Sequence, residues 1–295
     1  RVAIANFGPH PTLEEAVQGL KDALADAGFA EGEGVVYEYS HGNFDPSLTP
    51  QILNRLEAWG PDVLVTVTTP MTQASREIIQ DKDLPIVFAV VTLPVEAGLV
   101  PSWERGSERY VGSSNLQSMD AVIGFARDLL GEVTSFGMLY NTGDINDVNL
   151  VRYAEEAAGR HGLAFRSEGV ESAADIQTRA TALAGVDFIY VPASSLLQPG
   201  LPAVAVAADR MNIPVINASH PGVRDHTVLA SMAISWDRVG YNAGRLVAEI
   251  LGGKRPSELA NHRPAIEEHS ALVSGRRLAQ RGMTLPAALA GCDCV

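Results

Sequence analysis

Cysteine is nearly absent from this chain of 295 residues: the two present, Cys292 and Cys294, stand at its very end. Disulfide bonds therefore do not hold the body of the protein together, a composition found in exported and in cytosolic proteins. We expect the Cys-x-Cys tail to be a frayed end with free thiols, although a metal-ligand pair or a strained bridge is an alternative for this spacing.

Basic residues are too few to balance the acidic ones. The sequence has 22 Lys and Arg against 35 Asp and Glu, which gives a net charge of −13. This charge argues against nucleic acid and anionic membrane surfaces as partners. Long apolar runs are missing as well, and none reaches the length of a membrane span.

The signatures of common catalytic and metal sites are also missing. There is no Gly-x-Ser-x-Gly elbow, no His-Glu-x-x-His and no Gly-x-x-x-x-Gly-Lys loop, and Gly32-Glu33-Gly34 precedes a predicted strand instead of following one. His262, Glu267, Glu268 and His269 lack a regular ligand spacing and are expected in a solvated loop. We therefore expect no enzyme, no cofactor and no metal, and the lack of a helix-turn-helix before the first strand argues against a repressor.

The sequence does contain a regular alternation of strands and helices. Strands are predicted over residues 2–6, 35–39, 63–65, 85–91, 110–113, 135–140, 164–168, 188–191, 214–217, 228–233 and 270–273. Helices are predicted over 12–27, from Asp45 or Ser47 to 58, and over 70–79, 118–130, 146–161, 172–184, 202–211 and 236–251. Since such crossovers imply parallel sheets covered on both faces, and about five strands fall in each half, we expect an α/β protein of two Rossmann-like lobes.

The organising stretch of the first lobe is residues 62–79. An apolar run leads through a threonine-rich turn to Pro70, which is tolerated at the first helical position, and Thr69 is predicted to be the N-cap. The start of such a helix directs N–H groups and a partial positive charge at whatever lies above the strand, which suits a carboxylate. The alternative is that these threonines only cap the helix.

The other turns after strands carry small polar side chains with an occasional ring. Because ligands bind beyond the carboxyl ends of parallel strands, we expect these side chains to line a cleft between the two lobes. The alternative for each residue is a role in capping a helix or forming a turn. His10 is also a candidate pH switch or general base, and Trp236 either lines the cleft or packs in the core. Asp237 is expected to help cap its helix. The candidate ligand-binding residues are His10, Thr69, Pro70, Met71, Thr72, Gln73, Thr92, Asn115, Asn141, Thr142, Ser194, Asn217 and Trp236.

Several segments occur in the order and spacing of a known family. They are Val2-Ala3-Ile4-Ala5 with His10-Pro11, Gly19-Leu20-Lys21-Asp22-Ala23-Leu24, Thr69-Pro70 with Gln73-Ala74, Pro85-Ile86-Val87-Phe88, Val91-Thr92-Leu93-Pro94-Val95 with Ala97-Gly98-Leu99-Val100, Leu139-Tyr140-Asn141-Thr142-Gly143, Ile189-Tyr190-Val191-Pro192 and Ile213-Pro214-Val215-Ile216. Across roughly residues 1 to 275, the chain resembles ABC-transporter substrate-binding proteins of the tryptophan or aromatic amino-acid type, which have a type I periplasmic-binding-protein fold.

The resemblance implies a Venus-flytrap architecture with one lobe at 1–114 plus 234–262 and the other at 115–233 plus 263–295. Three hinge crossovers are expected near 113–116, 231–236 and 260–264, with ligand binding closing the lobes. It also implies a periplasmic protein, exported and freed of its signal peptide, that acts as a monomer and hands a small ligand to ABC permease subunits. The family's ligand pocket maps to Thr69, Pro70, Gln73, Thr92 and Asn141.

At two places the chain departs from the family's pattern. The family often has Thr-Asp-Asn where this chain has Ala193-Ser194-Ser195, and often has Asp in the segment that here reads Thr92-Leu93-Pro94. Since burying an ammonium group without an opposing charge is costly, the choice between an α-amino acid and another carboxylate stays open. Asp144, Asp147 and Asp237 are candidates for a substitute acid.

We interpret the chain as the extracytoplasmic solute-binding protein of an ABC importer, with an amino acid or related carboxylate as ligand. Two alternatives stay open. One is a sensory or regulatory ligand-binding domain of the same fold, which a DNA-binding or membrane-anchored partner segment would identify. The other is an enzyme on this scaffold, which would need a nucleophile–base pair that the sequence does not show.

Overall fold

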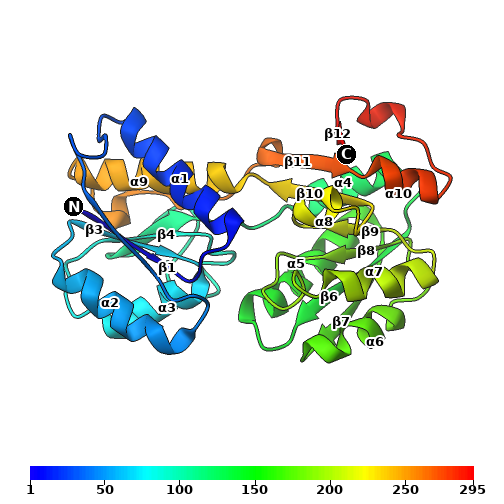
Figure 1. The fold of residues 1–295 in the computed structure, drawn as a ribbon, viewed down its shortest axis with the longest axis horizontal. Helices are drawn as coiled ribbons and strands as arrows, with labels where there is room; N and C mark the ends of the chain where they lie inside the picture. Colours follow the sequence, from blue (N-terminus) through cyan, green and yellow to red (C-terminus); the bar gives the residue numbers. More distant parts are fainter. The chain divides into compact units, whose positions relative to one another are not determined.

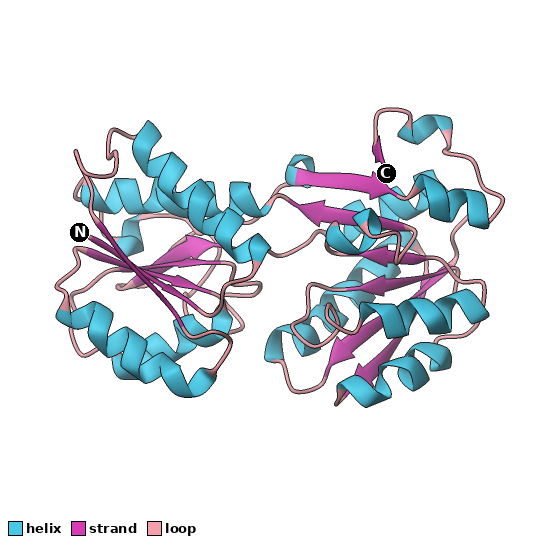
Figure 2. Cartoon of the chain, in the orientation of Figure 1, coloured by secondary structure: helices cyan, strands magenta, loops and turns pink.

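The computed structural model describes residues 1–295, apart from the side chain of Asp293. The chain divides into two compact units, unit 1 (Arg1–Leu116 and Ser235–Pro264) and unit 2 (Gln117–Ile234 and Ala265–Val295). Each unit is built around one sheet with helices on both faces (Figures 1 and 2). This architecture confirms the predicted α/β class with mostly parallel sheets.

The sheet of unit 1 is parallel throughout, with the strand order β2-β1-β3-β4-β5. Its strands are β1 (Val2–Asn6), β2 (Tyr37–His41), β3 (Val63–Val67), β4 (Ile86–Ala89) and β5 (Tyr110–Ser113). Ala3, Leu64 and Ile86 are in register on three neighbouring strands and belong to one apolar cluster. Apart from β2 these strands are buried on both faces, which is why their sequences are continuous apolar runs.

Two pairs of helices cover this sheet. α2 (Thr49–Ala58) and α3 (Thr69–Ile78) lie on one face, and α1 (Pro11–Asp26) and α9 (Trp236–Leu251) lie on the other (Figure 1). The single turns η1 (Pro46–Leu48) and η3 (Pro256–Glu258) complete the unit. Although α9 follows α1 by more than 200 residues, it supplies half of this covering layer.

Glycines allow α1 and α9 to approach backbone to backbone. A Cβ on Gly240 would overlap the carbonyl oxygen of Ala16, and a Cβ on Gly244 would overlap that of Leu20. Because Ala16 meets Gly240 and Leu20 meets Gly244, the two helices run in the same direction. Both therefore begin at the carboxyl edge of the sheet, the edge at which α1 follows β1.

The sheet of unit 2 has seven strands in the order β12-β11-β10-β9-β8-β6-β7, and only the β10–β11 pair is antiparallel among the described strands. The strands are β6 (Ser135–Asn141), β7 (Ala164–Val170), β8 (Phe188–Val191), β9 (Val215–Asn217), β10 (Ala230–Ile234), β11 (His269–Val273) and β12 (Asp293–Cys294). Stacked rings of Phe136 and Phe188, with centroids 5.2 Å apart, lie in the core on one face.

The helices of unit 2 divide between two apolar clusters. α4 (Met119–Leu130), α5 (Ile145–His161) and α10 (Gly275–Gln280) contribute to the cluster around Phe136, and α6 (Ile176–Ala182), α7 (Leu201–Arg210) and α8 (Pro221–Arg224) to the cluster around Ile189. Single turns are found at η2 (Ala173–Asp175), η4 (Ile266–Glu268) and η5 (Ala287–Leu289). The unit is thus a three-layer α/β structure like unit 1.

Several predicted element ends were wrong because local hydrogen bonds override the apolar pattern. The second strand starts at Tyr37 instead of 35, since Val35 closes a turn with Ala30 through an N–H···O bond of 3.2 Å. The strand predicted over 85–91 ends at Ala89, because Val90 has φ +60°. α6 is shorter than the predicted 172–184 because its first turn is the 3₁₀ turn η2.

The carboxyl-terminal tail was predicted to be frayed, and this was wrong. It contains α10, and β12 adds to the sheet by parallel pairing with β11, with Val295 N–H bonded to Val273 O at 3.0 Å. Neither Cys292 nor Cys294 is part of a disulfide bond. Within the part of the chain that the structure describes, no helix combines the length and apolarity that a membrane span requires, and no three His, Cys, Asp or Glu side chains gather as a metal site.

Candidate functional site

The start of α3 lies at the carboxyl end of β3, as predicted, but its N-cap is Thr68 and not Thr69. Thr68 has φ +84°, a conformation that is unusual for a β-branched residue, and its buried Oγ1 has no hydrogen-bond partner among the described residues. The Thr72 hydroxyl donates to Thr68 O at 2.8 Å and lies 2.9 Å from the hydroxyl of Thr66 on β3. These bonds fix the first turn of α3 onto its strand.

A second β-branched residue with positive φ lies directly after the neighbouring strand β4. Val90, with φ +60°, donates its N–H to Ser113 O at 3.1 Å, and Thr68 donates to Ala89 O at 3.0 Å, so the ladder continues past the regular strands. Strained backbone of this kind costs energy and persists where the surrounding structure determines it, often beside ligands. The strain thus marks one edge of the unit 1 sheet.

Thr92 and Asn115 also meet at this edge. The Thr92 hydroxyl donates to Asn115 Oδ1 at 3.0 Å, and the Ser114 hydroxyl donates to Thr92 O at 2.8 Å. Asn115 is 8% exposed. Two of the predicted residues therefore form one hydrogen-bonded pair at the ends of β4 and β5.

Two aromatic rings cover the β1–β2 end of the same edge. Phe44 N–H bonds to Phe7 O at 2.9 Å, and the two rings meet edge to face with centroids 5.9 Å apart. The Phe44 ring lies over Gly8, where a Cβ would come within 2.6 Å of it. Phe44 has φ +63° and is 48% exposed, an unusual degree of exposure for so large an apolar side chain. We call Phe7 and Phe44 the aromatic pair.

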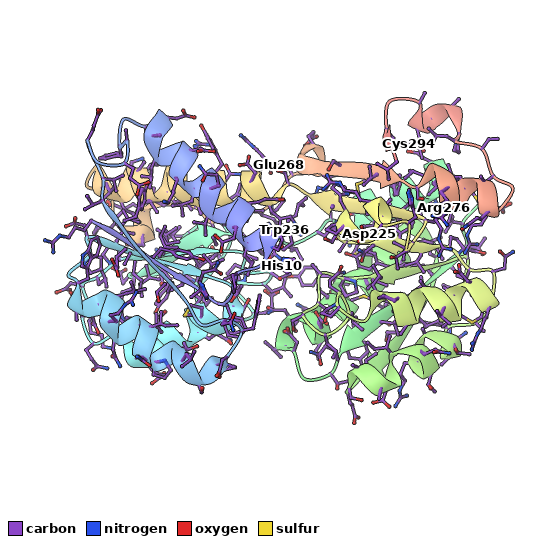
Figure 3. All side chains as sticks on the ribbon, in the orientation of Figure 1. His10, Asp225, Trp236, Glu268, Arg276 and Cys294 are labelled. Atoms are coloured by element: carbon purple, nitrogen blue, oxygen red, sulfur yellow. The ribbon has the colours of Figure 1, made fainter. Side chains whose placement is uncertain are left out.

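His10 and Trp236 mark the starts of α1 and α9 (Figure 3). His10 Nδ1 accepts the N–H of Thr12 and lies 2.7 Å from its hydroxyl, so the exposed ring caps α1. Trp236 is half-buried in the first turn of α9, which is capped by the Ser235 hydroxyl and not by Asp237. Asp237 was predicted to help cap its helix, and this role belongs to Ser235, whose extended backbone lets its hydroxyl reach the helix N–H groups.

In unit 2 the turn after β6 holds a buried acid. Asp147, in the first turn of α5, is 3% exposed, and its Oδ2 accepts the N–H of Asn141 at 2.9 Å. Burial raises the pKa of Asp147 to about 6, against the opposing effects of the Ser194 hydroxyl and the Asn141 N–H. Burial, with a further effect of the Asp147 charge, raises the pKa of the Tyr190 hydroxyl.

The amide of Asn141 stabilises its own turn. Asn141 Oδ1 accepts the N–H of Gly143 at 2.9 Å, while Thr142 is exposed and donates its N–H to Val170 O. Ser194, after β8, is 2% exposed, and its Oγ makes no hydrogen bond of standard geometry with any described residue. Asn141, Asp147 and Ser194 therefore gather at one edge of the unit 2 sheet.

Two predicted site residues have their side chains engaged in the interior of their units. Met71 is fully buried in the apolar cluster under α2 and α3. Asn217 is fully buried, and its amide exchanges hydrogen bonds of 2.8 and 3.2 Å with Gln198 and donates to Ser219 O. Pro70 is exposed and Gln73 half-buried on α3.

The residues predicted to bind ligand did not include Phe44, and Asp147 was named only as one of three candidate substitute acids. The only signal for Phe44 was a large apolar side chain between polar turn residues, in His41-Gly42-Asn43-Phe44-Asp45. The signal for Asp147 was an acid in the first helical turn, which is common for electrostatic reasons alone. Burial distinguishes Asp147 from Asp144, which is partly exposed and caps α5 through the Asn146 N–H.

Comparison with known proteins places this arrangement in a family. The sequence profile of the ABC transporter substrate binding proteins matches residues 1–290. The chain belongs to this family. Its members are extracytoplasmic substrate-binding proteins that bind small ligands, interact with ABC permeases and are typically not enzymes. The resemblance read from the sequence motifs is thereby confirmed.

Individual relatives agree with the assignment. A tyrosine-binding protein of Clostridioides difficile is 29% identical over 259 residues, which cover 88% of this chain and 74% of that protein. A solved structure of a conserved domain protein from Vibrio cholerae has 29% identity and a TM-score of 0.84, covering 99% of this chain and 98% of its own. A Streptococcus protein solved in complex with L-Trp has 23% identity and a TM-score of 0.85, with 100% and 99% coverage, and shows the shared fold.

Proposed function

We propose that this substrate-binding protein takes an aromatic amino acid, or a closely related aromatic carboxylate, as the ligand of an ABC importer. The observation that carries the proposal is the aromatic pair, Phe7 and Phe44, on the same sheet edge as the start of α3. One edge thus offers a ring surface and a helix N-terminus. The name of the tyrosine-binding relative supports this ligand class.

The ligand's carboxylate is assigned to the first turn of α3. The first backbone N–H groups of a helix lack intrahelical acceptors and carry a partial positive charge, so they favour an anion. The buried, unpartnered Thr68 hydroxyl stands at this turn and is a further donor. Offset or edge contacts between aromatic rings add about 0.5–1.5 kcal/mol beyond area burial, which suits the aromatic pair to a ligand ring.

The remaining polar groups are assigned to orientation of the ligand. Thr92 and Asn115 form a pair in unit 1, and Asn141 and Ser194 lie at the corresponding edge of unit 2. Neutral amides and hydroxyls orient a ligand by hydrogen bonds without the desolvation cost of full charges. We propose that these side chains donate and accept hydrogen bonds that orient the ligand.

We also propose the finer features that the resemblance implies. The ligand is released unchanged, without catalysis, to the permease; the protein works as a periplasmic monomer and does not bind nucleic acid. Recovery of the ligand after long incubation with the purified protein, analysed by chromatography, tests the absence of catalysis. A new product that accumulates with time would contradict it.

A thermal-shift screen followed by calorimetry tests the ligand class. The panel contains aromatic amino acids, aliphatic amino acids, aromatic carboxylates without the amine, and sugars as a control class. A ligand at a hundred times its dissociation constant stabilises the folded form by about 2.7 kcal/mol. We expect the aromatic compounds to shift the melting temperature, and a response to sugars alone would reject the proposal.

A further inference from the structure

The carboxyl of Asp147 has no cationic partner in unit 2. It lies at the end of β6 in the first turn of α5, with one oxygen bonded to the Asn141 N–H at 2.9 Å. Among the residues that the structure describes, it forms no ion pair with any Lys, Arg or His. The residue is 3% exposed, so water does not replace the missing charge.

The Ser194 hydroxyl is a second buried polar group at the same place. It faces the Asp147 carboxyl closely enough to lower the pKa of that acid, yet its Oγ completes no hydrogen bond of standard geometry with a described residue. Ser194 is 2% exposed, so water does not supply the missing partner. The Ser194 hydroxyl and the Asp147 carboxyl, which has no cationic partner, therefore lie together at the β6–β8 edge.

A purely local role does not account for this pair. A first-turn acid that only ties a turn to a helix gains from the helix dipole, and its pKa is then expected to fall. Here burial dominates and raises the pKa to about 6, with the negative charge of Asp144 acting in the same direction. Within the part of the chain that the structure describes, the Asp147 carboxyl therefore lacks a positively charged hydrogen-bond donor.

We propose that Asp147 binds the α-ammonium group of the ligand, with Ser194 Oγ accepting a second hydrogen bond from it. This inference rests on the proposed function and narrows the ligand to an amino acid instead of a deaminated carboxylate. An ammonium group carries three donors and no acceptor, which matches a carboxylate and a hydroxyl oxygen. Because the site is buried, the ammonium leaves water on binding, and an opposing charge becomes decisive.

The assignment makes binding dependent on pH. An ionised Asp147 is needed, so affinity for the amino acid is expected to be constant above about pH 6 and to fall by about tenfold per pH unit below it. The other titratable groups facing Asp147 are Asp144 on its own turn and Tyr190 on β8. The raised pKa of Tyr190 keeps its hydroxyl neutral across this range.

The test is calorimetry on the full chain with L-tyrosine, L-tryptophan, an aliphatic amino acid and the deaminated propionate analogues of both aromatic ligands. Asp147→Asn keeps the shape and the acceptor for Asn141 but removes the charge. We expect it to weaken amino-acid binding by about a hundredfold or more and to leave the deaminated analogues unaffected. The matched control Asp144→Asn, which caps α5 from a partly exposed position, is expected to retain binding.

A second variant guards against a folding defect. Ser194→Ala, with melting curves recorded for both variants, is expected to weaken amino-acid binding by about tenfold. Equal affinity of wild type and Asp147→Asn for the amino acid, or equal wild-type affinity for the amino acid and its deaminated analogue, overturns the inference. Asp147-dependent binding of the aliphatic amino acid alone supports the inference while rejecting the aromatic ligand. Binding of the deaminated aromatic analogues without binding of any amino acid overturns the inference and leaves the proposed function intact, and absence of binding to every compound rejects both.

Discussion

His269 Nε2 accepts the backbone N–H of Ser118 at 2.9 Å, which joins two chain segments 151 residues apart in the sequence. The other ring nitrogen, Nδ1, lies 2.8 Å from Ala265 O. Since Nε2 must be unprotonated to accept, the proton is on Nδ1 and is donated to that carbonyl. Ser118 and Ala265 both lie just inside unit 2, next to points at which the chain passes into it, so one neutral histidine connects these two segments.

Protonation of His269 is expected to destabilise the protein. Burial lowers its pKa, while Glu267 and Glu268 act in the opposite direction, so the unfolded chain binds the proton first, at about pH 6.5. The contribution is present above the unfolded pKa and is lost as pH falls through the folded one. The free energy of unfolding, measured in urea between pH 5 and 8, should therefore decrease toward low pH. His269→Gln should make this slope against pH smaller, and substitution of the exposed His41 by Gln should not. The same slope in both variants and in wild type would contradict the assignment.

Asp147 is expected to affect stability with the opposite sign. Its folded pKa is raised to about 6, so its contribution is present at low pH and is lost as pH rises through that value. Asp147→Asn should therefore have a higher free energy of unfolding than wild type at pH 7.5, by up to about 3 kcal/mol, and should differ little from it at pH 4. Urea unfolding at the two pH values measures the difference. If Asp147→Asn is less stable than wild type at pH 7.5, the carboxylate has a cationic partner that we have not identified.

Replacing Phe44 separates ligand binding from folding. The ring is 48% exposed on a strained turn, so Phe44→Gly removes the ring and relieves the positive φ. We expect an aromatic ligand to bind about tenfold more weakly, because a ring contact of about 1.5 kcal/mol is lost, while the free energy of unfolding holds or rises. Leu48→Ala, another exposed apolar residue nearby in sequence, is the control in calorimetry. Unchanged affinity in Phe44→Gly would remove the ring surface from the proposal.

The α1–α9 contact predicts a contrast between two glycines. Gly240→Ala places a methyl group on the Ala16 carbonyl oxygen and should destabilise the protein by about 2 kcal/mol or more, since the backbones must separate. Gly124→Ala in α4 meets nothing within 4 Å and should stabilise it by about 1 kcal/mol through helix propensity. Chemical unfolding of both variants measures the contrast. Equal effects would mean that the helices adjust at no cost.

The candidate site was predictable only where a side chain's role is local. Thr69, Thr92 and Asn141 follow strands, and their positions at sheet edges come from the alternation of elements alone. Whether a side chain stays available there is decided by neighbours distant in sequence. Asn217 looked like a ligand contact, yet Gln198 occupies its amide, and Met71 packs against α2. A sequence pattern records neither partner.

By itself, the sequence determined the α/β class, the two series of strands and helices, and the family, because apolar periodicity and motif spacing are properties of consecutive residues. Only the tertiary structure decided that α9 packs backbone to backbone against α1, that the tail closes the second sheet as β12, and that Asp147 is buried without a cation. The reason is physical: burial and charge pairing depend on which residues meet across the fold, and those contacts join positions far apart in the chain.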